Sequence, residues 1–308
     1  MTDNPTTATA DRVAEFDQGR KGFVHQVQHR LHVTPALVPL IVLVGSIAVF
    51  GALLGNKFFS PFALTLILQQ VQIVGIVGAA QALVILTAGI DLSVGAIMVL
   101  SSVIMGQFTF RYGLPVEVAV VSGLAIGTAI GAFNGWLVSA MKLPPFIVTL
   151  GMWQIVLAAN FLYSANETIR SQEIASEAPL LQVFGTTFRI GGAVFTVGAI
   201  FMIVLTLILA YVLRHTAWGR HVYAVGDDPE AAELSGVNVR ATLISVYALS
   251  GLICAFAGWA LIGRIGSVSP TSGQLANIDS ITAVVIGGIS LFGGRGSIMG
   301  MLFGAVIV

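Results

Sequence analysis

The sequence predicts an all-α, polytopic bundle of membrane-spanning helices. Of its 308 residues, 56% are hydrophobic and only 9% are charged, whereas about a quarter of the residues in a soluble domain are charged. The mean hydropathy is +0.94. The first long apolar run, residues 35–55, has the ~20 residues that a helix needs to cross a bilayer. These observations indicate that the chain lies in a membrane.

Further apolar runs predict the remaining spans. They lie near residues 62–88, 92–110, 116–140, 146–164, 192–213, 242–262 and 280–292, and another run starts near 298. Because the chain stops inside an apolar run, we expect a C-terminally truncated domain with eight spans and part of a ninth, out of about ten. Residues 35–308 form the predicted membrane domain. The polar tail before it, residues 1–34, is either disordered or a surface helix around 11–30.

Lysine and arginine in the connections predict the orientation, because they concentrate on the cytoplasmic side. With the N-terminus inside, nine of these residues lie in cytoplasmic positions and five outside. The segment 214–241 is then a cytoplasmic loop, and 164–190 is a periplasmic one.

Composition and motifs exclude several functions. The chain has 14 basic and 14 acidic residues, so no net charge points to nucleic acid. A single cysteine, Cys254, predicts no disulfide or thiol metal site. The sequence has no P-loop, H-E-x-x-H or G-x-S-x-G motif. We therefore expect no catalytic residues and no cofactor on this chain. The spans are too poor in charge to couple ions, so the energy source is expected on another protein.

The stretch "GIDLSVGAIMV", residues 89–99, places the carboxylate of Asp91 between two helices. One interpretation is that Asp91 N-caps the following helix after a tight break at Gly89. The other is that residues 89–95 interrupt a helix that lines a cavity, as in transporters. The faint echo "NIDSITAVVIGG", residues 277–288, puts Asp279 on the opposite side and suggests an inverted repeat.

Two other polar or small-residue patterns stand out. A glycine recurs at every fourth position in the span at 116–140, which predicts a flat stripe for close helix packing; its members are Gly123, Gly127, Gly131 and Gly135. The span at 62–88 carries several glutamines that are costly to expose to lipid. Whether these amides bond each other or a passing solute stays open.

The cytoplasmic loop contains a self-contained short helix. Asp228 is a good N-cap, Pro229 suits the first helical position, and Gly236 is a stop signal. Glu230, Ala231 and Ala232 lie between these ends. The alternative is an ordinary solvated connector.

Four motifs together resemble one protein family. "LTAGIDLSVGA", "KLPPFIVTLGM", "GRHVYAVGDDPEAAELSGVNV" and "AVVIGGISLFGGRGS" resemble the permease subunits of bacterial ABC importers for monosaccharides, of the ribose, xylose and fructose type. The similarity runs from about residue 35 to 308, and the fructose importer permease is the nearest branch. The resemblance implies a homodimer in the inner membrane, a cytoplasmic ATPase that uses ATP, and a periplasmic sugar-binding protein.

The resemblance also implies roles for the patterns above. The loop helix, Asp228 to Gly236, would dock into the ATPase. Sugar hydroxyls need donors and acceptors, so the predicted pathway residues are Gln70, Gln81, Asp91, Gln154 and Asn160. The expected cargo is fructose, with ribose or mannose as alternatives. A stand-alone secondary sugar carrier and a membrane scaffold without transport are the competing functions.

Overall fold

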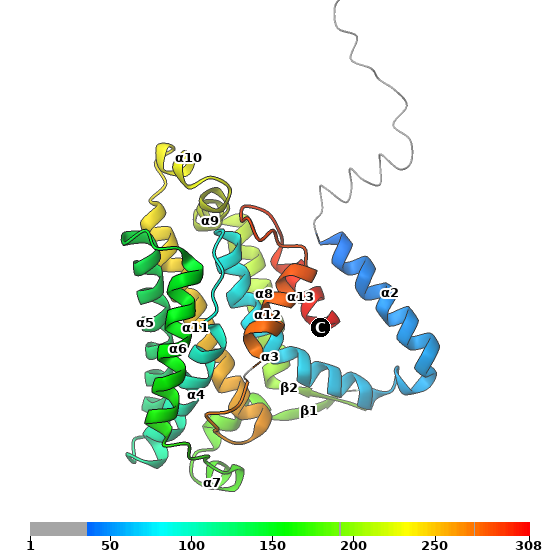
Figure 1. Cartoon of the computed structure of the whole chain (residues 1–308). Coiled ribbons are helices and arrows are strands. Elements are labelled where there is room, and N and C mark those ends of the chain that lie inside the picture. Colours follow the sequence, from blue (N-terminus) through cyan, green and yellow to red (C-terminus); the bar gives the residue numbers. More distant parts are fainter. Residues whose placement is uncertain (1–35, 191, 274) are drawn as a thin grey trace, which may run out of the picture. The chain divides into compact units, whose positions relative to one another are not determined.

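Helices dominate the computed structural model, which describes residues 36–190, 192–273 and 275–308 (Figure 1). The predicted tail, residues 1–34, lies outside these residues. The apolar helices are α2 (Leu37–Leu54), α3 (Pro61–Leu86), α4 (Val94–Phe110), α5 (Val116–Ala140), α6 (Pro145–Ser164), α8 (Val197–His215), α11 (Val239–Ile265), α12 (Ala276–Ile286) and α13 (Ile298–Ile307). The shorter elements are η1 (Gly55–Lys57), α7 (Ser171–Glu177), η2 (Pro179–Gly185), β1 (Thr187–Ile190), β2 (Ala193–Thr196), α9 (Ala217–Asp227) and α10 (Pro229–Leu234).

The apolar helices lie at the predicted spans. Among the described residues, six helices are long and apolar enough to cross a membrane, while α4, α12 and α13 are apolar but shorter. Two predicted boundaries are wrong. The run at 192–213 begins with strand β2 rather than helix. The span expected at 280–292 is α12, which ends at Ile286 because Gly288 adopts a left-handed backbone with φ of 77°.

Local sequence explains where the longest helices begin. The hydroxyl of Ser60 accepts a hydrogen bond from Ala63 N at the start of α3, and Pro61 occupies the first helical position. The hydroxyl of Thr196 caps α8 in the same way, through Ala199 N. The amide of Asn238 caps α11. These caps satisfy backbone N–H groups that have no partner inside the helix.

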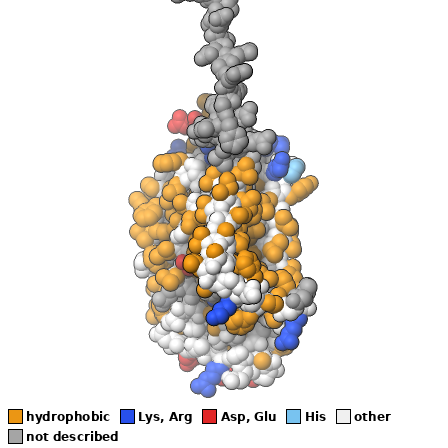
Figure 2. Space-filling view, turned by 90° about the vertical axis from the view of Figure 1, so that its right-hand side faces the viewer, with side chains coloured by type: hydrophobic (Ala, Val, Ile, Leu, Met, Phe, Trp, Pro, Cys, Tyr) orange, Lys and Arg blue, Asp and Glu red, His pale blue; other side chains and the backbone are white. Residues whose placement is uncertain are grey.

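α11 is the central helix of the bundle. It packs against α5, α4 and α3, and α3 also contacts α12 and α13. Of the membrane-spanning stretch of α11, 67% is buried inside the protein, compared with 6% of the corresponding stretch of α2. α2 contacts α13. Figure 2 shows hydrophobic side chains over the middle of one face and most of the charged side chains toward its two ends. This distribution matches a bilayer environment for the exposed apolar surface.

Two non-helical interruptions bring distant parts of the bundle together. Residues 87–93 separate α3 from α4, and residues 266–275 separate α11 from α12. The first helical turns of α4 and α12 then meet, since Asn277 bonds to the backbone of Gly95. Non-helical backbone of this kind is tolerated in a membrane protein only where protein or a polar cavity surrounds it.

Elements outside the apolar helices gather at the two ends of the bundle. At one end lie α7, η2 and the antiparallel hairpin β1–β2, in which Thr187 pairs with Thr196. At the other end lie α9 and α10 (Figure 1). The predicted segments 164–190 and 214–241 are therefore at opposite ends.

Candidate transport pathway

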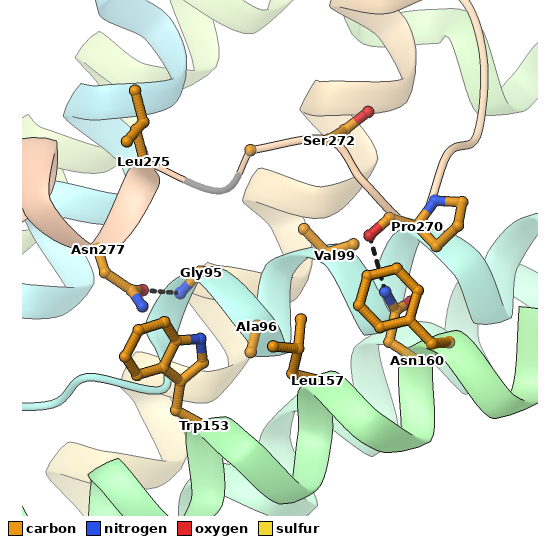
Figure 3. Close-up of a pocket in the computed structure, with 12 residues that line it drawn as sticks. Gly95, Ala96, Val99, Trp153, Leu157, Asn160, Pro270, Ser272, Leu275 and Asn277 are labelled. Carbon is orange, nitrogen blue, oxygen red and sulfur yellow. Dashed lines mark hydrogen bonds between the residues drawn. The ribbon is translucent and has the colours of Figure 1, made fainter. Parts of the chain in front are cut away.

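A cavity of about 330 Å³ lies where α4, α6 and α12 meet. Its walls come from α4 (Gly95, Ala96 and Val99), α6 (Trp153, Leu157, Asn160 and Phe161), the segment before α12 (Pro270, Ser272, Gly273 and Leu275) and α12 itself (Asn277). Figure 3 shows the Trp153 and Asn277 side chains at one end of the cavity and Asn160 at the other. The volume is at the lower end of the ~300–1,000 Å³ typical of small-molecule sites.

The cavity combines aromatic surface with uncharged polar groups. Asn160 Nδ2 donates to the carbonyl oxygen of Pro270 at 2.9 Å. Asn160 Oδ1 is buried and has no partner among the described residues. A buried acceptor without a partner is costly unless a water or solute hydroxyl donates to it. None of the described residues that line the cavity is charged, so the site suits a neutral polar solute.

Asn277 joins α12 to α4 at the edge of this cavity. Its Oδ1 accepts from Gly95 N at 2.6 Å, and its Nδ2 donates to the carbonyl oxygen of Leu92 at 2.7 Å. Ser93, the N-cap residue of α4, makes no side-chain cap bond. Asn277 therefore supplies from another helix the capping that α4 lacks locally.

Asp91 lies in a buried turn and does not cap α4 directly. Its Oδ1 accepts from the backbone N–H of Ser93 at 2.7 Å and from the Ser93 hydroxyl at 2.6 Å. Asn134 Nδ2 donates to that same hydroxyl. The break lies at Gly89 as expected, and its left-handed residue is the preceding Ala88, with φ of 59°. Asp91 thus orders the turn that leads into α4.

Two further side chains hold this turn. In the amide orientation that satisfies both atoms, Gln81 donates to the carbonyl oxygen of Asp91 and accepts from its N–H. The Thr149 hydroxyl donates to the carbonyl oxygen of Ile90 at 3.0 Å and accepts from Leu92 N at 3.1 Å. α3, α6 and α12 consequently all fix the interruption before α4.

The predicted pathway residues fall in three different environments. Asn160 lines the cavity. Asp91 is buried in the turn before α4, and Gln81 is buried in α3, where its amide bonds to that turn. Gln70 and Gln154 are exposed on the chain and do not line the cavity. Sequence reasoning missed Trp153 and Asn277. An amide at a helix start and an indole in an apolar run look like ordinary packing, although Asn277 lies within a quoted stretch and Trp153 directly follows one.

The glycine stripe of α5 faces neighbouring helices. A Cβ at Gly131 would collide with the carbonyl oxygen of Tyr247 and lie 3.0 Å from Gly251 Cα in α11. A Cβ at Gly127 would lie 2.7 Å from Ala255 Cβ, and one at Gly135 would lie 2.8 Å from Ile244 Cα. At Gly123 the neighbour is Met105 of α4. These positions have no room for a larger side chain.

The loop helix forms as its termini predict. Asp228 Oδ1 accepts from Glu230 N at 2.9 Å and from Ala231 N at 3.0 Å, and Pro229 begins α10. Gly236, just after the helix, has φ of 86°. Ala231 is exposed, but Ala232 is only 4% exposed. Of the two alanines in the helix expected to dock into the ATPase, Ala232 packs against its own chain and is not available for that contact, and only Ala231 is exposed.

The end of α9 contacts two loops of the bundle. A Cβ at Gly226 would lie 2.7 Å from Gly294 N and collide with the carbonyl oxygen of Leu86, and Gly294 N donates to that oxygen at 3.0 Å. Tyr223 donates its hydroxyl to the carbonyl oxygen of Gly296. Burial raises the pKa of Tyr223, which keeps this donor protonated. α9 thus links α10 to the break before α4.

The buried turn at Asp91 gives a stability prediction. We expect Asp91→Leu to leave the Ser93 N–H and hydroxyl without their acceptor, at about 1–3 kcal/mol for each buried group. Asp91→Asn keeps Oδ1 and should lose less. Thermal unfolding of the purified protein in detergent measures the difference, with Asp279→Leu on α12 as control. Equal unfolding temperatures for Asp91→Leu and the wild type would contradict this role.

Interrupted apolar helices around a solute-sized pocket define a membrane permease, the class of protein that provides a path through a bilayer. The chain belongs to the family described as branched-chain amino acid transport system / permease component, whose model matches residues 63–308. Membership makes it a multi-pass protein of the inner membrane and a transport component rather than an enzyme.

Individual relatives agree with the sequence resemblance, which is confirmed. The chain is 73% identical over 296 residues to fructose import permease protein FrcC of Rhizobium meliloti, covering 96% of this chain and 82% of that protein. It is 36% identical over 277 residues to ribose import permease protein RbsC of Escherichia coli K12, covering 89% and 82%. It is 33% identical over 297 residues to xylose transport system permease protein XylH of the same strain, covering 79% and 75%. No solved structure matches this chain.

Proposed function

We propose that this chain is the permease subunit of an ATP-driven ABC importer that moves fructose from the periplasm to the cytoplasm. The observation that carries the proposal is the uncharged cavity of about 330 Å³ between α4, α6 and α12. Its indole and amides match the apolar faces and hydroxyl groups of a monosaccharide. The 73% identity to a fructose import permease supports fructose over ribose or xylose.

The proposed orientation puts the N-terminus and α10 in the cytoplasm. The bias of Lys and Arg toward that side supports it. The hairpin and α7 are then periplasmic, together with a hollow of about 690 Å³ lined by Arg111, Glu167, Arg170 and Glu173. We assign this charged mouth to the side on which a sugar-binding protein delivers its cargo.

The proposed partners are a second permease copy, a cytoplasmic ABC ATPase and the periplasmic binding protein. α10 is the contact proposed for the ATPase, through Asp228, Pro229, Glu230, Ala231 and Gly236. The helix that precedes it, α9, contacts the end of α3 through Gly226 and Leu86, next to the break before α4, and this contact supports the assignment. Binding of ATP on the partner would thereby reach the cavity.

Packing supports the proposed inverted repeat. α3, α4 and α5 correspond to α11, α12 and α13 in this scheme. α11 packs on α4 and α5, while α3 packs on α12 and α13; α4 packs on α5 as α12 packs on α13. An interruption precedes both α4 and α12, and their N-termini meet at Asn277. Inverted repeats of this kind place substrate sites at their interface.

Uptake of labelled fructose by cells that lack the native permease tests the proposal. Trp153→Ala should lower uptake about tenfold or more at equal expression, because a central aromatic contact is lost. Gln154→Ala, on the exposed side of the same turn, should transport normally. Competition by unlabelled ribose, xylose and mannose identifies the preferred sugar. Uptake that persists without the ATPase would instead indicate a secondary carrier.

A further inference from the structure

Asn277 uses its whole side-chain amide to connect two helices that are far apart in sequence. Both hydrogen bonds go to the backbone of residues 92–95, more than 180 positions away. Asn277 is only 6% exposed, yet it borders the cavity together with Gly95 and Ala96. A solute in the cavity therefore lies beside the group that joins α12 to α4 (Figure 3).

Gly95 permits this connection. A Cβ at position 95 would lie 2.6 Å from Asn277 Oδ1, which is closer than real Cβ atoms come to other atoms. The next-nearest side chain, Ala276, would be 3.5 Å away, an ordinary contact. The Asn277 amide is therefore the side chain that leaves no room for a Cβ at position 95.

The segment that carries Asn277 is tied at both ends by asparagines. Asn160 holds Pro270 at one end, and Asn277 holds α4 at the other. The described residues 270–273 and 275 lie outside α11 and α12, and Gly273 has φ of 68°. The backbone bonds of Ser272 N and Ala276 N stay within this part of the chain, to Ser269 O and Gly273 O. The hydrogen bonds that tie it to α6 and α4 come from asparagine side chains, so a movement of α12 away from α4 breaks side-chain bonds.

We infer that Asn277 is a latch: it holds α12 to α4 between transport events and exchanges its two backbone partners for hydroxyl groups of the passing sugar. A hydroxyl both donates and accepts, so a sugar can satisfy Oδ1 and Nδ2 together. Opening without a sugar would leave the buried amide of Asn277 unpaired, which is unfavourable. The latch is a positioning device, and it rests on the proposed function of the cavity.

ATP hydrolysis by the complete transporter in proteoliposomes tests the latch. The permease, its ATPase and the binding protein are assembled, and hydrolysis is measured with and without fructose. Asn277→Ala should raise sugar-independent hydrolysis and lower the sugar moved per ATP, each about fivefold or more, as expected when a coupling interaction is removed. Ile278→Ala, the exposed neighbour on α12, should match the wild type.

A double mutant separates the latch from general damage. Gly95→Ala should uncouple the transporter as Asn277→Ala does, since its methyl group displaces the amide. The double variant should be no worse than Asn277→Ala, because the methyl group then has room. If Asn277→Ala fails to assemble, Asn277→Asp retains the acceptor for Gly95 N and should show a smaller uncoupling.

Two outcomes would overturn the inference. In one, the Asn277 variants keep normal sugar stimulation; in the other, all activities fall only in proportion to the amount of folded complex, which indicates a structural role. The Trp153→Ala variant distinguishes a wrong latch assignment from a wrong assignment of the cavity as the sugar site. If Trp153→Ala abolishes uptake while Asn277→Ala behaves normally, the assignment of the cavity is supported and the latch role of Asn277 is contradicted. If Trp153→Ala transports normally, the cavity assignment itself fails.

Discussion

Gly131→Leu is expected to abolish accumulation of folded protein. The glycine in α5 lies directly on the α11 backbone, where even a methyl group would collide with the carbonyl oxygen of Tyr247. Backbone atoms at a close contact between two long helices cannot yield as the end of a flexible side chain can. Overpacking in a core typically costs about 1–3 kcal/mol, and a side chain of four carbons here should exceed that range.

Gly151→Leu is the matched control for this prediction. Gly151 lies in α6, also within a span, and a Cβ there meets no other group within 4 Å. Both substitutions add the same apolar volume and the same helix propensity. Size-exclusion chromatography in detergent should show a monodisperse peak for Gly151→Leu and aggregation for Gly131→Leu. A stable Gly131→Leu protein with altered sugar preference would instead place the stripe on the pathway.

Features determined by neighbouring residues could be predicted from the sequence. The apolar helices follow from runs of hydrophobic residues, and α10 follows from Asp228, Pro229 and Gly236, which act within one turn of the helix. The end of α12 was predicted too late because its apolar run continues through Leu291 and Phe292, although the backbone already turns at Gly288. Hydrophobicity alone does not show where a helix stops.

The cavity could be predicted only in part, because its parts come together through contacts between distant residues. Asn160 was identified as a polar residue in an apolar run. Asn277 has the same chemistry, but its importance depends on Gly95, 182 positions away. Gln81 and Asp91 were identified as unusual polar groups, and they support the turn beside the cavity rather than line it. Sequence pattern indicates that a buried polar group needs a partner without showing which one.

α10, the helix proposed to contact the ATPase, carries an apolar side chain that its own chain does not cover. Leu234 is 90% exposed at the end of α10, the same exposed fraction as Phe292 in the loop after α12. A single exposed leucine does not by itself require a partner, but Leu234 lies on the helix proposed to contact the ATPase and is therefore the apolar side chain available for that contact. Ala232, by contrast, is buried, so Ala232→Arg should damage the permease fold instead of the interface.

We therefore expect Leu234→Asp to uncouple the transporter while leaving it folded. An exposed position tolerates the change within about 0.5 kcal/mol, but a carboxylate placed in an apolar contact with the ATPase loses its hydration without a partner. Sugar-stimulated ATP hydrolysis should fall about tenfold or more, as for an interface hot spot, with normal expression and normal elution in detergent.

Phe292→Asp tests whether the ATPase instead contacts the loop after α12. It makes the same change as Leu234→Asp at an equally exposed apolar residue. The loop that carries Phe292 also contacts α9, through Gly293 and Gly226, so it could receive movement either directly from the ATPase or by way of α10. Loss of stimulated hydrolysis in Leu234→Asp alone assigns the ATPase contact to α10. Loss in Phe292→Asp alone would move the contact to the loop after α12 and contradict the role proposed for Asp228 to Gly236. Loss in both would mean that the ATPase holds the two segments together, so that one movement reaches both Leu86 and Gly294.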